Sequence, residues 1–271
     1  MAPSSSDASA AALDPNACGE LECRLYDTPE DAFRAILATK PMVVAVGEAH
    51  AQKGTEGIDS SAKRFTARIL PVLEGRASDL LVELMAPAAG CKAKVEAVRE
   101  KQKQVTAPQA DTNQNEYVLM GNAAKARGIV PDMLRPSCDD LAAIDDAGAD
   151  AIAASLSTIA RLTTKKSESL VDRNRKLDPD KIVVTYGGAM HNDREPPPES
   201  AGWSFGADVA KYVGGKYVEI DMFVPEFIQD TDTWKKQDWY AHFDKNRAPT
   251  KTTLFNPKPG QYVLIYPATP K

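Results

Sequence analysis

The sequence predicts an α/β fold, with a mainly parallel central sheet flanked by helices on both faces and room for antiparallel strands late in the chain. Short apolar, β-branched runs alternate with helical segments along most of the 271 residues. This alternation is typical of parallel sheets with right-handed crossovers. The chain shows no repeat array and no convincing linker. We therefore expect a disordered leader at residues 1–16 and a single α/β domain at residues 17–271.

Each expected element follows from a local residue pattern. Residues 28–40 predict a helix, since a Thr cap, a Pro at the first helical position and acidic residues open the segment. The run at residues 42–46 is too short for a buried helix and is β-branched, which predicts a central strand followed by a turn. The same reasoning predicts helices at residues 60–75, 88–104, 116–128, 139–161 with a break at Gly148, and 205–215, and strands at residues 79–85, 129–136, 181–188, 216–224 and 261–267. Residues 166–180 are either a charged surface helix or a loop.

The composition excludes two classes of partner. Hydrophobic residues make up 43% of the chain and charged residues 26%, but no apolar run approaches the roughly 18 residues that span a bilayer. The net charge of −5 leaves no excess of Lys and Arg for a phosphate backbone. We therefore expect a small-molecule or peptide substrate and no nucleic acid, and the oligomeric state stays open.

The cysteines indicate a compartment. Cys18, Cys23, Cys91 and Cys138 form an even set without CxxC spacing, so we expect the disulfides Cys91–Cys138 and Cys18–Cys23. Four buried thiols are the alternative. Disulfides predict an extracytoplasmic protein, whether secreted, periplasmic or a lipoprotein. On this hypothesis the natural precursor carried a removed signal or a lipid anchor, and Met1 would not belong to the natural protein.

Two of the three histidines occupy the same local pattern. His50 closes the motif Gly47-Glu48-Ala49-His50, and His191 closes a Gly-x-x-His motif that begins at Gly188; each motif follows a predicted buried strand. The glycines predict a tight turn that directs the histidine into the cleft. Since ligands bind beyond the carboxyl ends of parallel strands, we expect both rings at one site. The alternative is that both histidines only cap strand ends.

A carboxylate ends the intervening strand. Glu83, within the run at residues 79–85, would be costly to bury without a partner such as a metal, a histidine or Arg135. A purely structural ion pair is the alternative. Glu48 is expected to orient His50, or else to be a solvated turn residue.

Three further residues are weaker candidates. His242 lies among aromatic residues and is expected to be packed or at the surface rather than a ligand. Asp221 and Glu226 close another strand end and could form a second rim of the site. Loop capping or surface charge explains them equally well.

This residue set predicts hydrolysis of an acyl bond. His50, His191 and Glu83 form a ligand set for a divalent metal such as Mn, Co or Zn, which lowers the pKa of bound water. Without a metal, one histidine would act as general base, a carboxylate would fix its tautomer, and the other histidine would polarise the carbonyl. Either version places His50, His191 and Glu83 at the centre of the site with Glu48 in support.

At these residues the sequence resembles the Tiki/TraB, ChaN and erythromycin-esterase-like superfamily. Its members share an α/β core, a first GxxH-type motif after a leading strand, a glutamate at the end of the following strand, and a late histidine. The matches are the two GxxH motifs and Glu83, and the resemblance covers residues 43–222. The esterase branch carries an arginine soon after the first histidine, whereas the first arginine here is Arg64. The two GxxH motifs are closer to the Tiki/TraB pattern.

The resemblance implies more than one activity. Tiki-like members look like metal-dependent proteases, the esterase branch opens lactones, and ChaN-like members bind haem. A peptide or ester hydrolase is thus the leading expectation. The alternative is a haem- or iron-binding envelope protein in which His50, His191 or Tyr186 provides the axial ligand. An inactive interaction domain is a third reading, and whether residues 192–203 form a lid stays open.

Overall fold

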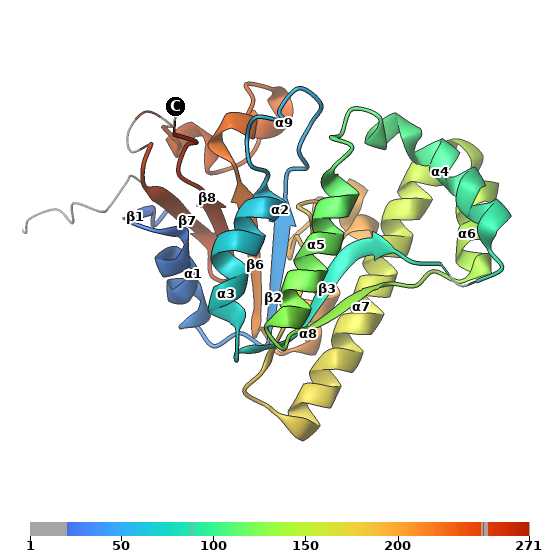
Figure 1. Cartoon of the computed structure of the whole chain (residues 1–271), viewed down its shortest axis with the longest axis horizontal. Coiled ribbons are helices and arrows are strands. Elements are labelled where there is room, and N and C mark those ends of the chain that lie inside the picture. Colours follow the sequence, from blue (N-terminus) through green and yellow to red (C-terminus); the bar gives the residue numbers. More distant parts are fainter. Residues whose placement is uncertain (1–20, 88, 245, 247–248, 271) are drawn as a thin grey trace, which may run out of the picture.

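An eight-stranded mixed sheet runs through the protein in the order β1-β7-β8-β6-β2-β5-β3-β4 (Figure 1). The computed structural model describes residues 21–87, 89–244, 246 and 249–270. The strands are β1 (Arg24–Tyr26), β2 (Val43–Glu48), β3 (Ala77–Met85), β4 (Val130–Leu134), β5 (Ile182–Gly188), β6 (Tyr217–Phe223), β7 (Thr252–Lys258) and β8 (Gln261–Ile265). Strand β7 pairs antiparallel with β1 and β8, and the other pairings are parallel. The predicted fold class is confirmed.

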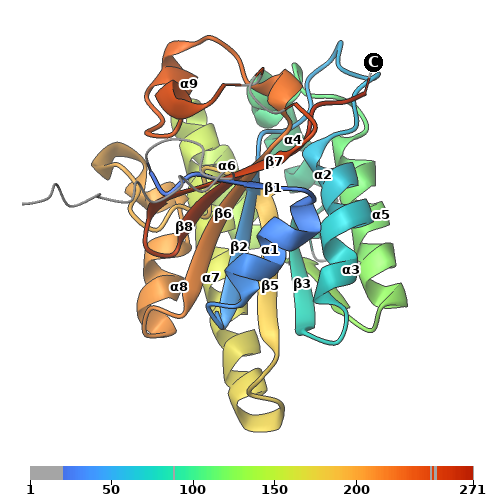
Figure 2. The same ribbon diagram turned by 90° about the vertical axis from the view of Figure 1, so that its left-hand side faces the viewer.

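Helices cover both faces of this sheet (Figure 2). They are α1 (Pro29–Leu37), α2 (Ser61–Arg64), α3 (Leu70–Leu73), α4 (Lys92–Thr106), α5 (Asn113–Ala126), α6 (Cys138–Asp146), α7 (Ala151–Leu177), α8 (Gly206–Tyr212) and α9 (Asp232–Lys235). Helices α1, α3 and α5 bury apolar residues against Val44 and Val184 on one face. Helices α7 and α8 do the same against Val43 and Val183 on the other. Successive strand residues point to opposite faces, so both sides of β2 and β5 are buried.

Local chemistry explains where the helices begin and end. Thr28 caps α1, since its side-chain oxygen accepts a hydrogen bond from the Asp31 amide at 3.1 Å. The expected helix at residues 60–75 contains a π-helical segment, Phe65–Ile69, between α2 and α3. The expected break near Gly148 is confirmed as a short 3₁₀ segment. The charged residues after it continue α7 as one helix to Leu177.

Strands β1 and β7 were not predicted. Strand β1 is only three residues long, and β7 has Asn256 and Pro257 near its end, where the sequence indicates an irregular segment. Their antiparallel pairing puts β1 at one edge of the sheet. The expected disordered leader, residues 1–16, lies outside the described residues.

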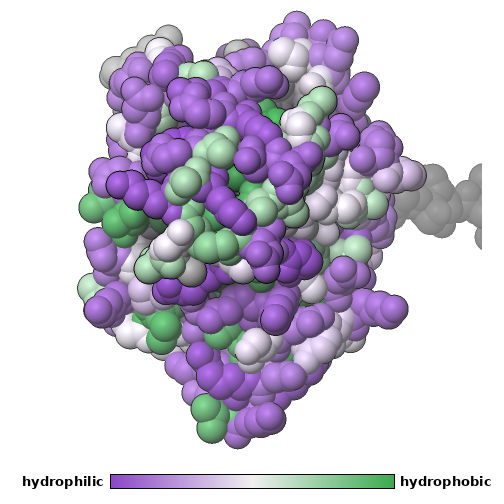
Figure 3. Space-filling model, turned by 90° about the vertical axis from the view of Figure 1, so that its right-hand side faces the viewer, coloured by the Kyte–Doolittle hydropathy of each residue, from purple (hydrophilic) through white to green (hydrophobic). Residues whose placement is uncertain are grey.

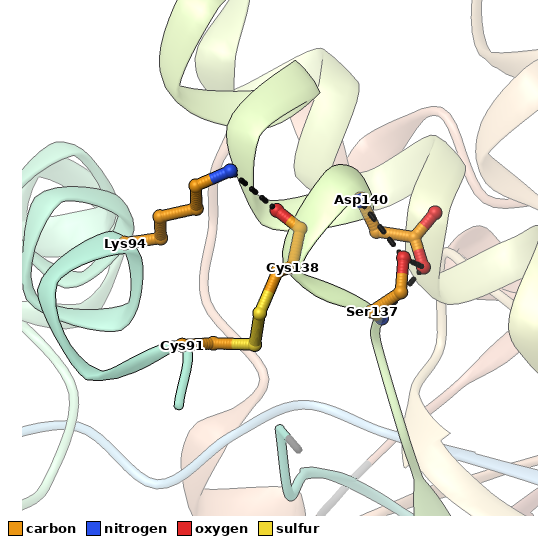
Figure 4. Close-up of a disulfide and its surroundings, with 5 residues drawn as sticks. All are labelled: Cys91, Lys94, Ser137, Cys138 and Asp140. Atoms are coloured by element: carbon orange, nitrogen blue, oxygen red, sulfur yellow. Dashed lines mark hydrogen bonds between the residues drawn. A yellow bond between two sulfur atoms is a disulfide. The ribbon is translucent and has the colours of Figure 1, made fainter. Parts of the chain in front are cut away.

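The Cys91–Cys138 disulfide ties the loop after β3 to α6 (Figure 4). Around it, α4, α6 and the start of α7 share a small apolar cluster that contains Val98, Leu141 and Ala151. The sulfur bridge therefore supports a helical layer that lies beyond the end of the sheet. The proposed partner of Cys23 is Cys18, which lies outside the described residues.

The surface is mostly hydrophilic on the side of the molecule seen in Figure 3, where apolar residues form only small groups. Within the described part of the chain, no helix is both long and apolar enough to cross a membrane.

We expect the Cys91→Ala/Cys138→Ala double variant to be less stable than the wild type. The bridge joins two residues that are 47 positions apart in the sequence. Loss of the cross-link should lower the free energy of unfolding by about 2–4 kcal/mol, because the unfolded chain regains conformational freedom. Denaturant unfolding of both proteins measures the difference. An unchanged midpoint, or a peptide map that links Cys91 to another cysteine, would contradict this pairing.

Candidate active site

The two GxxH motifs lie side by side because they end neighbouring parallel strands. In the pairing of β2 with β5, Gly47 is opposite Gly187 and Glu48 is opposite Gly188. The Ala189 amide then donates a hydrogen bond to the Glu48 carbonyl oxygen at 3.1 Å. Residues that are far apart in the sequence thus meet at the carboxyl edge of the sheet, which is where ligands bind in open α/β sheets.

The strand glycines allow close packing, and Gly188 also opens a tight turn. Gly47 and Gly188 lie within β2 and β5 and are not among the residues with positive φ. A Cβ on Gly47 would lie 2.7 Å from the Ala189 Cα and 2.5 Å from Asp221 Oδ1. A Cβ on Gly187 would collide with the Glu83 side chain. The expected tight turn is confirmed in the second motif, where the His191 amide donates a hydrogen bond to the Gly188 carbonyl oxygen at 3.0 Å. At Gly47 and Gly187 glycine is needed because other groups occupy the space of a side chain.

Glu48 is a buried hydrogen-bond acceptor for three side chains. His50 Nδ1 donates to Glu48 Oε1 at 2.9 Å, and the Tyr117 hydroxyl donates to the same oxygen at 2.8 Å. The Tyr186 hydroxyl donates to Oε2 at 2.6 Å. Glu48 is only 4% exposed, so it is not a solvated turn residue. These three donors compensate the burial of its charge and hold the His50 ring in one orientation.

The two tyrosines keep their protons. Burial raises the pKa of Tyr117 and of Tyr186 well above the ordinary value, and the charge of Glu48 raises both further. Their rings pack edge to face, 5.5 Å apart. Both hydroxyls therefore remain donors to Glu48. No sequence pattern indicated Tyr117, and Tyr186 was expected only as an alternative haem ligand.

His50 has an unusual proton affinity. Burial alone would lower the pKa of its imidazole, but the hydrogen bond to Glu48 and the charges of Glu48 and Glu83 raise that pKa to about 9. The side chain of His50 is 25% exposed, so the ring is still reachable from solvent. At neutral pH it is an imidazolium whose Nε2 carries a proton.

His191 is buried more deeply, with its side chain 6% exposed. Its Nδ1 lies 2.6 Å from the carbonyl oxygen of Trp203. A carbonyl oxygen only accepts hydrogen bonds, so Nδ1 carries a proton. The other ring nitrogen, Nε2, lies 3.5 Å from Glu83 Oε1. The hydrogen bond to Trp203 could not be predicted from the sequence, because every residue has a backbone carbonyl.

Glu83 lies between the two imidazoles. Its Oε2 accepts a hydrogen bond from the Gly188 amide at 2.7 Å. A Cβ on Gly188 would lie 3.3 Å from His50 Nε2 and 3.8 Å from Glu83 Oε2. The structure therefore brings His50, His191 and Glu83 together around Gly188, with Glu48 behind His50. Glu83 is compensated by this amide, by His191 and by the charge of His50, whereas the suggested partner Arg135 is exposed.

The donor set of the site has the chemistry of a metal site. Each Nδ1 is held by an oxygen acceptor and each Nε2 faces the Glu83 region, which is how metal-binding histidines are usually oriented. Among the residues that the structure describes, however, no group of three or more His, Cys, Asp or Glu side chains could hold a metal ion. A divalent metal held by His50, His191 and Glu83 therefore stays a prediction.

The weaker candidates lie elsewhere. His242 is exposed, in the short helical turn Tyr240–His242. Glu226 accepts a hydrogen bond from the Thr269 amide at 2.5 Å and so caps a loop. Asp221 lies beneath Gly47, where it accepts a hydrogen bond from Asn192 Nδ2 at 3.0 Å. Burial raises the pKa of Asp221 to about 7. It supports the floor of the site rather than its rim.

A small pocket opens beside Glu83 and His191 on the face of the sheet that α7 covers. Its polar lining consists of Glu83, His191, Thr163, Thr185 and Asn192, and Phe205 and Ile159 are among its apolar walls. The volume open to water is about 10 Å³, which matches about one water molecule. The pocket is too small for an organic ligand of any size.

In comparisons with protein-family models, curated proteins and solved structures, no match to this chain was found. The fold and the site therefore define the protein at the level of a class: a mixed, mostly parallel α/β protein with paired imidazoles and carboxylates at the carboxyl edge of its sheet.

We expect His50 to titrate near pH 9 and the Glu48→Gln variant to lower that pKa towards 6.5, because the charge of Glu48 is lost. Ring-proton NMR measures both values, since the chain has only three histidines to assign. Because the folded pKa is raised, the His50–Glu48 pair stabilises the fold fully below pH 6.5 and loses this effect as the pH rises through 9. Glu226→Gln, remote from His50, is the control. A wild-type value near 6.5 would contradict the arrangement.

We expect Gly187→Ala to destabilise the protein by about 1–3 kcal/mol, because the new methyl group must displace Glu83. Gly57→Ala is the matched control, since a Cβ there meets nothing within 4 Å. Thermal unfolding compares the two variants with the wild type. Equal melting temperatures for both variants would show that Glu83 does not occupy this position.

Proposed function

We propose that the protein is a hydrolase of an acyl bond, in a peptide or an ester, with His50, His191 and Glu83 at its centre and Glu48 in support. One observation carries the proposal. Two imidazoles have Nδ1 fixed by an oxygen acceptor and Nε2 turned towards the same carboxylate, at the carboxyl edge of the sheet. The resemblance to the Tiki/TraB branch implies the same class of reaction.

His50 is the group that meets the acyl substrate. Its side chain is the more exposed of the two rings, at 25% against 6% for His191. With a pKa of about 9 it is cationic at neutral pH. An imidazolium is a hydrogen-bond donor for the carbonyl oxygen and stabilises the negative charge that develops there in the transition state. Glu48 and its two tyrosine donors keep the ring in place for this role.

His191 is the general base. Its ring is nearly buried, so the group from which it takes a proton is a water molecule. Nδ1 carries a proton for the Trp203 carbonyl, so Nε2 is free to accept one. One water O–H bond breaks as its oxygen bonds to the acyl carbon, and the proton passes to Nε2. His191 Nε2 then returns this proton to the leaving oxygen or nitrogen as its bond to the acyl carbon breaks, which restores the neutral ring. Glu83 stabilises the transient cation on His191.

The substrate is a small molecule or a peptide in an extracytoplasmic compartment. The Cys91–Cys138 disulfide supports this localisation, because such bridges persist in oxidising environments. A secreted, a periplasmic and a lipid-anchored form all fit this chemistry.

The test is a substrate panel of aryl esters, lactones and quenched peptides, each assayed after chelation and again with added Mn, Co or Zn. We expect His50→Ala, His191→Ala and Glu83→Gln each to lower kcat/KM by about 10²–10⁴-fold, the usual contribution of positioned acid–base groups. The control is His242→Ala, an exposed histidine outside the site, which should retain wild-type turnover.

Two results would overturn the proposal. The first is unchanged turnover in His50→Ala and His191→Ala on any substrate that the wild type cleaves. The second is a Soret band on haem titration that vanishes in the same variants, together with no hydrolysis, which would favour haem binding instead.

A further inference from the structure

Two deeply buried polar atoms in the pocket beside His191 have no hydrogen-bond partner among the residues that the structure describes. They are Thr185 Oγ1 and Asn192 Oδ1. Thr185 is 3% exposed and Asn192 is 2% exposed, and both residues line the pocket. A buried polar atom without a partner costs free energy, so native proteins usually satisfy such atoms with protein groups or with ordered water.

The orientation of the Asn192 side chain is fixed by its neighbours. Its Nδ2 faces two acceptors, the Ala45 carbonyl oxygen at 3.3 Å and Asp221 Oδ1 at 3.0 Å. Both amide protons are therefore used, and a flipped amide would place oxygen against oxygen. Oδ1 is the end that remains available, as an acceptor only.

Thr185 lines the same pocket from β5, opposite Ala45, whose carbonyl oxygen accepts the hydrogen bond from Asn192. It pairs with Ala45 on β2 and with Leu81 on β3, so its side chain shares a face with Glu83, two residues further along β3. Its hydroxyl can both donate and accept. The pocket thus presents a hydroxyl, an amide oxygen and a carboxylate around a volume of about 10 Å³.

We infer that this pocket is a binding site for one water molecule, and that this water is the nucleophile of the proposed hydrolysis. A water needs two to four polar partners and about this much volume. It would accept from or donate to Thr185 Oγ1 and donate to Asn192 Oδ1, within reach of Glu83 and of His191 Nε2. Thr185 and Asn192 are then positioning residues, and the second half of the inference rests on the proposed function.

The choice of water follows from the partners. The two unpaired atoms are neutral, and the remaining walls are largely apolar, including Leu81, Ile159 and Phe205. An organic ligand is excluded by size. His191 also needs a small reaction partner, since its side chain is 6% exposed.

The experiment compares Thr185→Val with Thr164→Val. Valine has nearly the shape of threonine, so little else changes. The control, Thr164, bonds the Ala160 carbonyl oxygen on α7 at 3.0 Å and does not line the pocket. High-resolution crystal structures of the wild type and of both variants should show a water within about 3.2 Å of Thr185 Oγ1 and Asn192 Oδ1, lost only in Thr185→Val.

The melting temperature gives a second readout that does not depend on any activity. If a bound water forms a hydrogen bond with the Thr185 hydroxyl, Thr185→Val removes that bond and leaves the water without one of its partners. The melting temperature should then fall by about 2–4 °C. If the hydroxyl is unsatisfied, valine removes a buried penalty and the melting temperature rises. A rise, together with a pocket without water in the crystal, would overturn the water site.

Turnover then tests the role of the water. On a substrate that the wild type cleaves, we expect Thr185→Val to lower kcat about tenfold or more with KM little changed, and Thr164→Val to change neither. A bound water with unchanged kcat in Thr185→Val would refute the nucleophile role and leave the proposed function standing. A failed proposed function shows itself separately, as His50→Ala and His191→Ala variants with wild-type turnover.

Discussion

The geometry of the site depends on the burial of one carboxylate. Glu48 is held at the end of β2, where it would be strongly destabilising without compensation. Its donors come from three different parts of the fold: His50 from the loop after β2, Tyr117 from α5 and Tyr186 from β5. The charge can be buried only when all three elements are in place. The hydrogen bonds that compensate the burial of Glu48 therefore also orient His50.

The two histidines differ because their acceptors differ. His50 bonds to a carboxylate, which favours the cationic ring, and His191 bonds to a neutral carbonyl, which requires a proton on Nδ1 but adds no full charge. Two motifs of the same Gly-x-x-His pattern thus yield two chemically distinct groups. Their exposure differs in the same sense, since the cationic ring is open to solvent and the other ring is nearly enclosed. This asymmetry supports the proposal that His50 contacts the substrate and that His191 activates water.

The parts of the site that could be predicted from the sequence are those fixed by strand order. His50, His191 and Glu83 follow buried apolar runs, and parallel strands bring their carboxyl ends to one edge. Hydrogen-bond partners could not be predicted in this way. Tyr117 is 69 residues from Glu48, and its place depends on how α5 packs rather than on any local pattern. In the fold, β1 was missed because it is an edge strand of only three residues, and β7 was missed because Asn256 and Pro257 interrupt its strand pattern.

The strand glycines Gly47 and Gly187 have a wider consequence for this architecture. The backbone there is in direct contact with Asp221, Ala189 and Glu83, so a side chain added at either glycine would displace a group of the site. Changes of selectivity would therefore have to be introduced at the side chains that line the pocket, such as Ile159, Thr163 and Phe205, while both glycines are kept.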